Sequence, residues 1–142
     1  MTIPPATLTE HDDRWILPFR GLAVSQIQVD FAFGLVFDDV CAVRISNTAS
    51  LGWINVAEKK PEKIALDPER QAVAAGLVLF FNAEVTSAVA FKSGALRITF
   101  GDGHLLNVKP DPNYEAWTAT GPDGMLIVSL PGSGLAVWNS RP

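Results

Sequence analysis

The sequence predicts a mainly β fold, an antiparallel β-sandwich or half-open barrel built from two meanders, with one helix between them over about residues 68–81. Three observations predict it. Apolar side chains occupy every second position from Ile27 to Phe37. Short runs of β-forming residues alternate with glycine turns over residues 84–108. The same pattern returns over residues 108–138, so we expect about eight or nine short strands.

The first meander follows an N-terminal stretch, residues 1–14, whose prolines and charges lack periodicity and indicate a loose arm. The run from Val24 to Phe37 is long for one strand, since strands usually have about 5–6 residues. We therefore expect a bend or hairpin near Asp30 to Phe33. Asp38-Asp39 indicates a turn, and Cys41 to Ile45 alternates as the next strand.

The segment between the meanders holds a strand, a charged stretch and a helix. Leu51 and Trp53 fall on one face of the strand, whereas Ile54 and Val56 fall near the other. The charges from Glu58 to Lys63 make burial in the core unfavourable, so we expect a mobile connection there.

The helix begins at a capping signal. Asp67 is suited to the N-cap, Pro68 to the first helical position, and the carboxylate of Glu69 to the positive end of the helix dipole. Apolar residues then recur at helical spacing, and Asn82 is the expected end.

The second meander comprises the runs 84–91, 95–100 and 104–108. It resembles the first, because Val24-Ser25 matches Val85-Thr86 and residues 35–39 match residues 98–102. The sequence therefore hints at two copies of one β module, although any three-stranded meander would look similar.

The last third has the strongest turn chemistry. The runs 116–120, 125–130 and 135–138 are separated by Gly121-Pro122-Asp123-Gly124 and Pro131-Gly132-Ser133-Gly134. They predict three more strands. We expect Trp117 and Trp138 to be largely buried, because tryptophans in small domains are usually part of the core.

The motifs of this last third, DPNYEAW, GPDG and PGSGLAVW, resemble the C-terminal signature of an uncharacterised, mainly actinobacterial family, a domain of unknown function. The similarity covers residues 17–22 and 84–138, whereas residues 46–63 do not match closely. Relatives tend to have consecutive glycines where this chain has residues 131–134, a change confined to a turn. Because the family has no established activity, the resemblance implies no catalytic residue.

Composition is that of a single globular domain spanning residues 1–142. Apolar residues make up 48% and charged residues 18% of the chain, against typical values of about 45–50% and about 25%. The formal net charge is −4, and no basic cluster is free of interspersed acids, so we expect no nucleic-acid partner.

Cys41 is the single cysteine, which excludes an intrachain disulfide and a zinc site built from several thiolates. The longest uncharged apolar run, residues 72–83, is too short for a bilayer, which takes about 20 residues, and the N-terminus lacks the pattern of a signal peptide. We expect a cytoplasmic protein without a membrane partner.

Candidates for chemistry are isolated in the sequence. His11 lies in the expected arm, and His104 follows a Gly-Asp-Gly turn. Asp111 and Glu115 could form an acid–base pair, but a role in a turn and in hydrogen bonding is the simpler interpretation. No basic cluster flanks the Cys41 thiol. We therefore predict no catalytic residue, no metal site and no cofactor.

The leading functional hypothesis is a non-enzymatic protein-binding module of the immunity type, which neutralises a toxin by covering its active site. The alternatives are a small-molecule-binding protein or enzyme with a cavity between the meanders, and a self-associating structural subunit. The predicted partner surface consists of acidic residues of turns and of the charged stretch, which could attract a basic toxin, and one tryptophan: Asp38, Asp39, Trp53, Glu58 and Glu62.

Overall fold

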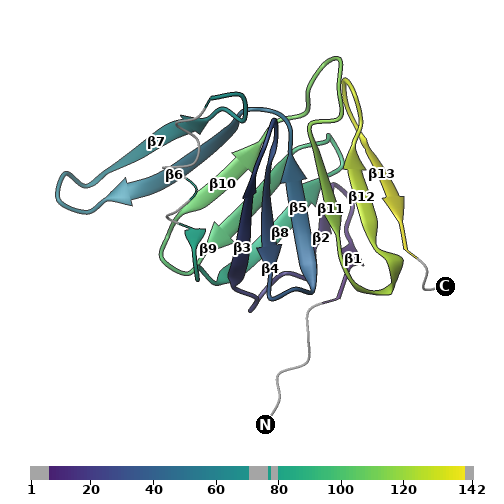
Figure 1. Cartoon of the computed structure of the whole chain (residues 1–142), viewed down its shortest axis with the longest axis horizontal. Coiled ribbons are helices and arrows are strands. Elements are labelled where there is room, and N and C mark those ends of the chain that lie inside the picture. Colours follow the sequence, from purple (N-terminus) through teal and green to yellow (C-terminus); the bar gives the residue numbers. More distant parts are fainter. Residues whose placement is uncertain (1–6, 71–76, 78–79, 140–142) are drawn as a thin grey trace, which may run out of the picture.

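Two antiparallel sheets pack face to face in the computed structural model, which describes residues 7–70, 77 and 80–139 (Figure 1). The seven-stranded sheet has the order β1(Thr9–Glu10), β2(Arg14–Ile16), β8(Val85–Phe91), β9(Leu96–Phe100), β10(Leu105–Val108), β6(Ala49–Asn55), β7(Lys60–Leu66). The six-stranded sheet has the order β13(Leu135–Trp138), β12(Leu126–Ser129), β11(Trp117–Thr120), β5(Cys41–Ile45), β4(Phe33–Phe37), β3(Val24–Val29). The predicted mainly β sandwich is confirmed, and neither sheet closes into a barrel.

The core lies between the sheets, because alternate residues of most strands face inward. On β9, Leu96, Ile98 and Phe100 are buried while Arg97 is exposed. On β5, the predicted alternation from Cys41 to Ile45 is likewise present. Buried hydrophobic side chains therefore fill the space between the two layers.

The two meanders repeat one structure. The first strand of each has a register shift near its start, over Val24–Gln26 in β3 and over Val85–Ser87 in β8. The segments that enter these strands lie side by side and form an antiparallel bridge between Ala23 and Glu84. The bridge joins equivalent residues of the two halves, which is the arrangement expected when two halves are related by a pseudo-twofold axis.

Packing is repeated as well. The ring centroids of Phe19 and Phe37 are 4.9 Å apart in the first half, and those of Phe80 and Phe100 are 4.9 Å apart in the second. In each pair, one ring precedes the first strand of the meander and the other ends the second strand. The similarity noticed in the sequence thus corresponds to a structural repeat.

Each half contributes a hairpin to the other half's sheet. After β5 the chain crosses to the seven-stranded sheet, where β6 pairs with β10, and after β10 it crosses back, so that β11 pairs with β5. The registers are equivalent, because Ile45 lies opposite Trp117 and Val108 lies opposite Ala49. The halves are therefore intertwined, and the β6–β7 hairpin is the counterpart of the β11–β12 hairpin.

A buried polar latch joins the sheets at one end. The carbonyl oxygen of Gly94, in the β8–β9 turn, accepts hydrogen bonds from Trp117 Nε1 at 2.9 Å and from Ser129 Oγ at 2.8 Å. Gly94 has a φ of +108°, and a Cβ there would lie 3.0 Å from Pro110 Cβ, so the position requires glycine. Trp117 is 1% exposed, as predicted.

Trp138 corrects the second half of that prediction. Its side chain is 54% exposed, because β13 is an edge strand and Trp138 lies on the outer face of the six-stranded sheet, opposite Leu126. The place of Trp138 in the C-terminal motif therefore did not indicate that its side chain is buried.

Two other expectations, both about segments at the surface, are also corrected by the structure. Within the predicted arm, residues 1–14, Thr9–Glu10 forms β1, and Arg14 begins β2, which pairs with β8; residues 1–6 lie outside the described residues. The charged stretch from Glu58 to Lys63 is not merely a connection, because Lys60–Leu66 forms β7.

The predicted helix over about residues 68–81 falls largely outside the described residues, which omit 71–76 and 78–79. At the described start, residues 68–70 lie in a turn, where Asp67 Oδ1 accepts a hydrogen bond from the Glu69 amide at 3.0 Å. Leu77 is helical and buried. In the described part of the chain, no helix has both the length and the apolarity needed to cross a membrane.

Candidate functional site

The β6–β7 hairpin extends beyond the sheet that supports it. β10 pairs with β6 only from Ala49 to Gly52, whereas β6 and β7 stay paired as far as Asn55 and Lys60. We call residues 53–62 the hairpin arm. Figure 1 shows this arm projecting away from the two layers. The equivalent β11–β12 hairpin has a shorter pairing, from Thr118 to Thr120, so the arm is an addition to the repeated module.

Side chains give the end of the arm a defined shape. Asn55 Oδ1 accepts a hydrogen bond from the Glu58 amide at 3.2 Å, and Asn55 Nδ2 donates to Glu62 Oε1 at 3.2 Å. Lys60 Nζ lies 3.0 Å from Glu58 Oε2. Because these contacts already order the end of the arm, binding a partner there would cost less conformational entropy.

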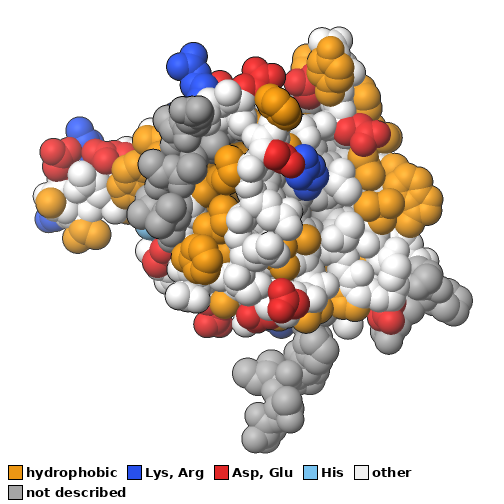
Figure 2. All heavy atoms as spheres, in the orientation of Figure 1, with side chains coloured by type: hydrophobic (Ala, Val, Ile, Leu, Met, Phe, Trp, Pro, Cys, Tyr) orange, Lys and Arg blue, Asp and Glu red, His pale blue; other side chains and the backbone are white. Residues whose placement is uncertain are grey.

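Two large apolar side chains of the arm face solvent. Ile54 is 62% exposed and Val56 is 82% exposed. Trp53 lies on the other face, where it packs partly against the core and its ring centroid is 6.1 Å from that of His104. Figure 2 shows hydrophobic and charged side chains next to one another on the projecting arm. Such mixed apolar and polar surfaces are typical of protein-binding sites.

Three of the predicted partner-surface residues lie together on this arm: Trp53, Glu58 and Glu62. Trp53 and Glu62 are register partners on the two strands. Asp38 and Asp39 lie elsewhere, in the β4–β5 turn of the six-stranded sheet. The sequence interpretation missed Ile54 and Val56. Their position on the strand face opposite Trp53 was the available signal.

The Asp38-Asp39 turn has a structural role of its own. Both residues have positive φ, 50° and 58°, which aspartate tolerates better than most residues. Asp38 Oδ2 also accepts a hydrogen bond from the Ala23 amide at 3.1 Å. The carboxylate of Asp38 therefore helps to hold the entry into β3.

A hollow of about 530 Å³ lies where the arm meets the outer face of the seven-stranded sheet. Trp53, Ile54 and Pro61 line it from the arm. Arg97 and Leu105 line it from the sheet. A neighbouring hollow of about 390 Å³ shares Ser50, Lys63 and Asn107 with it and adds Lys109. Because they share these residues, the two hollows adjoin across β9, β10, β6 and β7, and we call the pair the cationic hollow.

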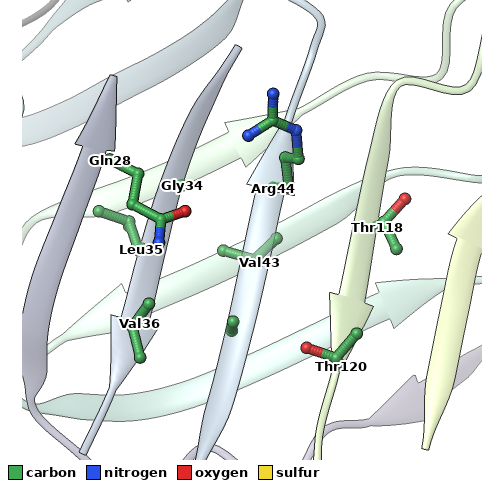
Figure 3. Close-up of a pocket in the computed structure, with 9 residues that line it drawn as sticks. Gln28, Gly34, Leu35, Val36, Val43, Arg44, Thr118 and Thr120 are labelled. Atoms are coloured by element: carbon green, nitrogen blue, oxygen red, sulfur yellow. The ribbon is translucent and has the colours of Figure 1, made fainter. Parts of the chain in front are cut away.

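The six-stranded sheet has a hollow of about 260 Å³ at the equivalent place (Figure 3). Gly34 and Arg44 of this hollow are opposite one another in the register, as Arg97 and Asn107 are in the cationic hollow. Thr120 occupies the place of Gly52, since each lies opposite the corresponding residue of the neighbouring meander strand. The repeat therefore provides two versions of one outer surface.

The two versions differ in their charges. Arg44 Nη2 lies 2.9 Å from both carboxylate oxygens of Asp30, so its charge is neutralised. The hydrogen bond from the Ala32 amide, followed by the bonds from Arg44, lowers the pKa of Asp30 below its ordinary value. In the cationic hollow, by contrast, no ion pair to Arg97 or Lys63 is found among the described residues.

The residues considered for chemistry do not assemble into a catalytic arrangement in the described part of the chain. Burial raises the pKa of the Cys41 thiol to about 11, so it is protonated at neutral pH. His104 Nδ1 lies 2.9 Å from Asp102 Oδ2, although the angle is not that of a hydrogen bond. His11 is exposed near the β1–β2 turn. No group of three or more His, Cys, Asp or Glu residues is placed to hold a metal ion in the described ranges.

Asp111 and Glu115 have separate surroundings. Asp111 Oδ1 accepts from the amides of Asn113 and Tyr114 at 2.8 and 3.1 Å, which is the turn role that the sequence suggested. Glu115 is exposed. Their part of the signature therefore shapes a loop that leads into β11.

Comparison with protein-family models gives a match over most of the chain. Residues 15–139 match the model of a family described as a family of unknown function, DUF6188. No curated protein and no solved structure matches the chain.

Proposed function

The chain belongs to DUF6188, a family of unknown function, and we propose that it is a non-enzymatic protein-binding module whose partner docks on the hairpin arm. One observation carries the proposal. The arm extends beyond β10 and presents Ile54 and Val56 to solvent, although an unsupported two-stranded ribbon is only marginally stable by itself.

The energetic contribution of such docking can be estimated. Full burial of a valine or isoleucine side chain contributes about 1.5–3 kcal/mol, and Ile54 and Val56 expose well over half of their surface. Burying both would contribute about 2–4 kcal/mol, which corresponds to about 30- to 1,000-fold in affinity. The well-defined turn at Asn55 favours binding further, because it is already formed in the free protein.

The buried core favours this proposal over a ligand cavity between the meanders. The facing sides of the two sheets are occupied by hydrophobic side chains such as Phe33, Leu51 and Ile98. The hollows described above lie on the outer faces of the sheets, where a macromolecular partner has access.

An immunity protein that covers the active site of a toxin is one form that such a module could take. The acidic Asp38-Asp39 turn supports that form, since acidic turns attract basic partners. This turn and the hairpin arm belong to different sheets, so the two surfaces can be tested separately.

The test is site-specific photo-crosslinking in the cells from which the gene comes. A photoreactive amino acid replaces Val56 in the arm or, as a matched control, Val40 in the β4–β5 turn, because both are exposed valines in turns. We expect a discrete protein adduct from position 56 and none from position 40. An adduct from position 40 alone would move the site to the acidic turn, and no adduct from position 56 would overturn docking on the arm.

A further inference from the structure

We propose that the cationic hollow binds an acidic, extended segment of a protein partner, with the carboxylates of that segment on Arg97 and Lys63 and its apolar side chains against Ile54 and Leu105. The inference rests on the proposed function, because the hairpin arm forms one wall of the hollow. It adds the chemistry of the partner and a second contact surface.

The first argument is charge. Lys63, Arg97 and Lys109 line the two adjoining parts of the cationic hollow, and none of them has an ion pair among the described residues. Glu62 is the one carboxylate that lines it in the described structure, and its Oε1 already accepts a hydrogen bond from Asn55. In a chain of net charge −4, this face therefore has a local excess of positive charge.

The second argument is the orientation of Arg97. Its Nε donates to Asn107 Oδ1 at 3.3 Å, and its guanidinium lies 5.1 Å from the centroid of the Phe91 ring. Arg14 lies on the same ring at 4.8 Å. These contacts hold the Arg97 guanidinium, and its Nη atoms have no hydrogen-bond or ion-pair partner among the described residues. A guanidinium fork matches a carboxylate in two parallel hydrogen bonds.

The third argument comes from the repeat. At the equivalent surface of the six-stranded sheet, Asp30 neutralises Arg44, and Figure 3 shows Arg44 at one end of a hollow otherwise lined by small, apolar and uncharged polar side chains. Gly52 leaves the floor of the cationic hollow open, whereas Thr120 stands at its counterpart. The fold itself therefore does not require unpaired cations or an open floor at this place.

The chemistry favours a protein segment over a nucleic acid. Phosphate backbones are usually held by many cationic contacts, about 6–10 in typical duplex complexes, and here three cations line the depression. Trp53, the aromatic residue that lines it, packs partly against the core and lies beside the His104 ring, which limits the ring surface left for stacking on bases. Ile54, Pro61 and Leu105 instead offer an aliphatic wall suited to apolar side chains.

Binding of a defined probe tests the inference. The probe is a fluorescein-labelled octapeptide in which Glu alternates with Leu, and the matched probe has Gln in place of Glu. Fluorescence anisotropy is measured at about 20 and about 200 mM salt, where screening separates the electrostatic part of binding. We expect the Glu peptide to bind the wild-type protein more tightly than the Gln peptide, with the difference shrinking at the higher salt.

Variants locate the site. Arg97→Gln and Lys63→Gln should each raise the Kd of the Glu peptide about fivefold or more at low salt, the scale of about 1 kcal/mol for one ion pair. Gly52→Thr, which copies the counterpart residue Thr120, should weaken binding by filling the floor. Arg44→Gln is the matched control and should change the Kd less than twofold, because Asp30 already neutralises Arg44.

Four outcomes overturn the inference. The first two are that the Glu peptide does not bind at up to about 1 mM, a range that covers weak interactions, or that the Glu and Gln peptides bind equally. The other two are that Arg44→Gln has an effect as large as that of Arg97→Gln, or that a labelled octathymidine binds more tightly than the Glu peptide, which would assign the surface to nucleic acid. Crosslinking from position 56 separates the two proposals. An adduct there without peptide binding refutes the acidic segment alone, whereas peptide binding without an adduct refutes docking on the arm alone.

Discussion

The carbonyl group of Gly94 receives two buried side-chain donors, and this arrangement makes a specific prediction about coupling between the sheets. Trp117→Phe removes the indole N–H and keeps an aromatic ring in the core, whereas Ser129→Ala removes the hydroxyl. Either single variant leaves the carbonyl with one donor. The double variant leaves it with neither side-chain donor, in a site that is closed to water.

The expected magnitudes follow from the contacts. Ser129→Ala should cost about 0.5–1.5 kcal/mol of unfolding free energy, the net value of one neutral hydrogen bond. Trp117→Phe should cost about 2–3 kcal/mol, because it also loses buried ring volume. The double variant should cost about 1–3 kcal/mol more than the sum, since a buried acceptor without a partner carries the full desolvation penalty.

Urea unfolding followed by circular dichroism gives the four free energies of this double-mutant cycle. Trp138→Ala is a suitable control, because that tryptophan is half exposed and its loss should cost clearly less than the loss of Trp117. Costs of the two latch variants that add to within about 0.5 kcal/mol would refute the reasoning, because they would show that the carbonyl does not couple the two donors.

Three further predictions concern titration and charge. Burial raises the pKa of Cys41 to about 11, so alkylation of the folded protein at about pH 8 should be about a hundredfold slower than in urea; a rate within tenfold would contradict the burial. The hydrogen bond from the Ala32 amide is the largest cause of the lowered pKa of Asp30, so the stability it contributes is present above about pH 4 and is lost as the pH falls through the folded-state pKa. Asp30→Asn should therefore flatten the dependence of unfolding free energy on pH between about 2 and 5, and an unchanged slope would oppose this role. If a basic partner docks at the acidic turn, Asp38→Asn with Asp39→Asn, which keeps residues tolerant of positive φ, should slow its association at low salt and leave it unaltered at high salt, as stopped-flow rates can show; equal rates at low salt would exclude that docking.

Much of the sandwich follows from local patterns. β5 and β9 have one face in the core, so their apolar residues alternate and their strands are readable from the sequence. The turn residues around Asp102 and Asp123 mark chain reversals in the same way. These signals depend only on neighbouring residues, which is why they predicted the strands of both meanders and of the C-terminal third.

The hairpin arm and the cationic hollow were harder to predict from the sequence, for physical reasons. Beyond Gly52 the arm has no third strand beside it, so little of β7 is buried and its sequence, rich in charges, does not alternate. β1 is two residues long and exposed, which leaves no periodicity to detect. Arg97 and Lys63 line the same hollow only because the two halves exchange hairpins, and this non-local pairing is not encoded in any local pattern.

Quantitative affinity capture with hairpin variants tests docking on the arm most directly. Ile54→Ser with Val56→Ser removes the exposed apolar side chains and should leave the unfolding free energy within about 0.5 kcal/mol per site, as for most surface substitutions. Val40→Ser is the matched control on the other sheet. For the partner identified by crosslinking from position 56, we predict at least about tenfold less capture by the double variant than by the control, in line with the estimated burial energy. Equal capture by the two would contradict docking on the hairpin arm.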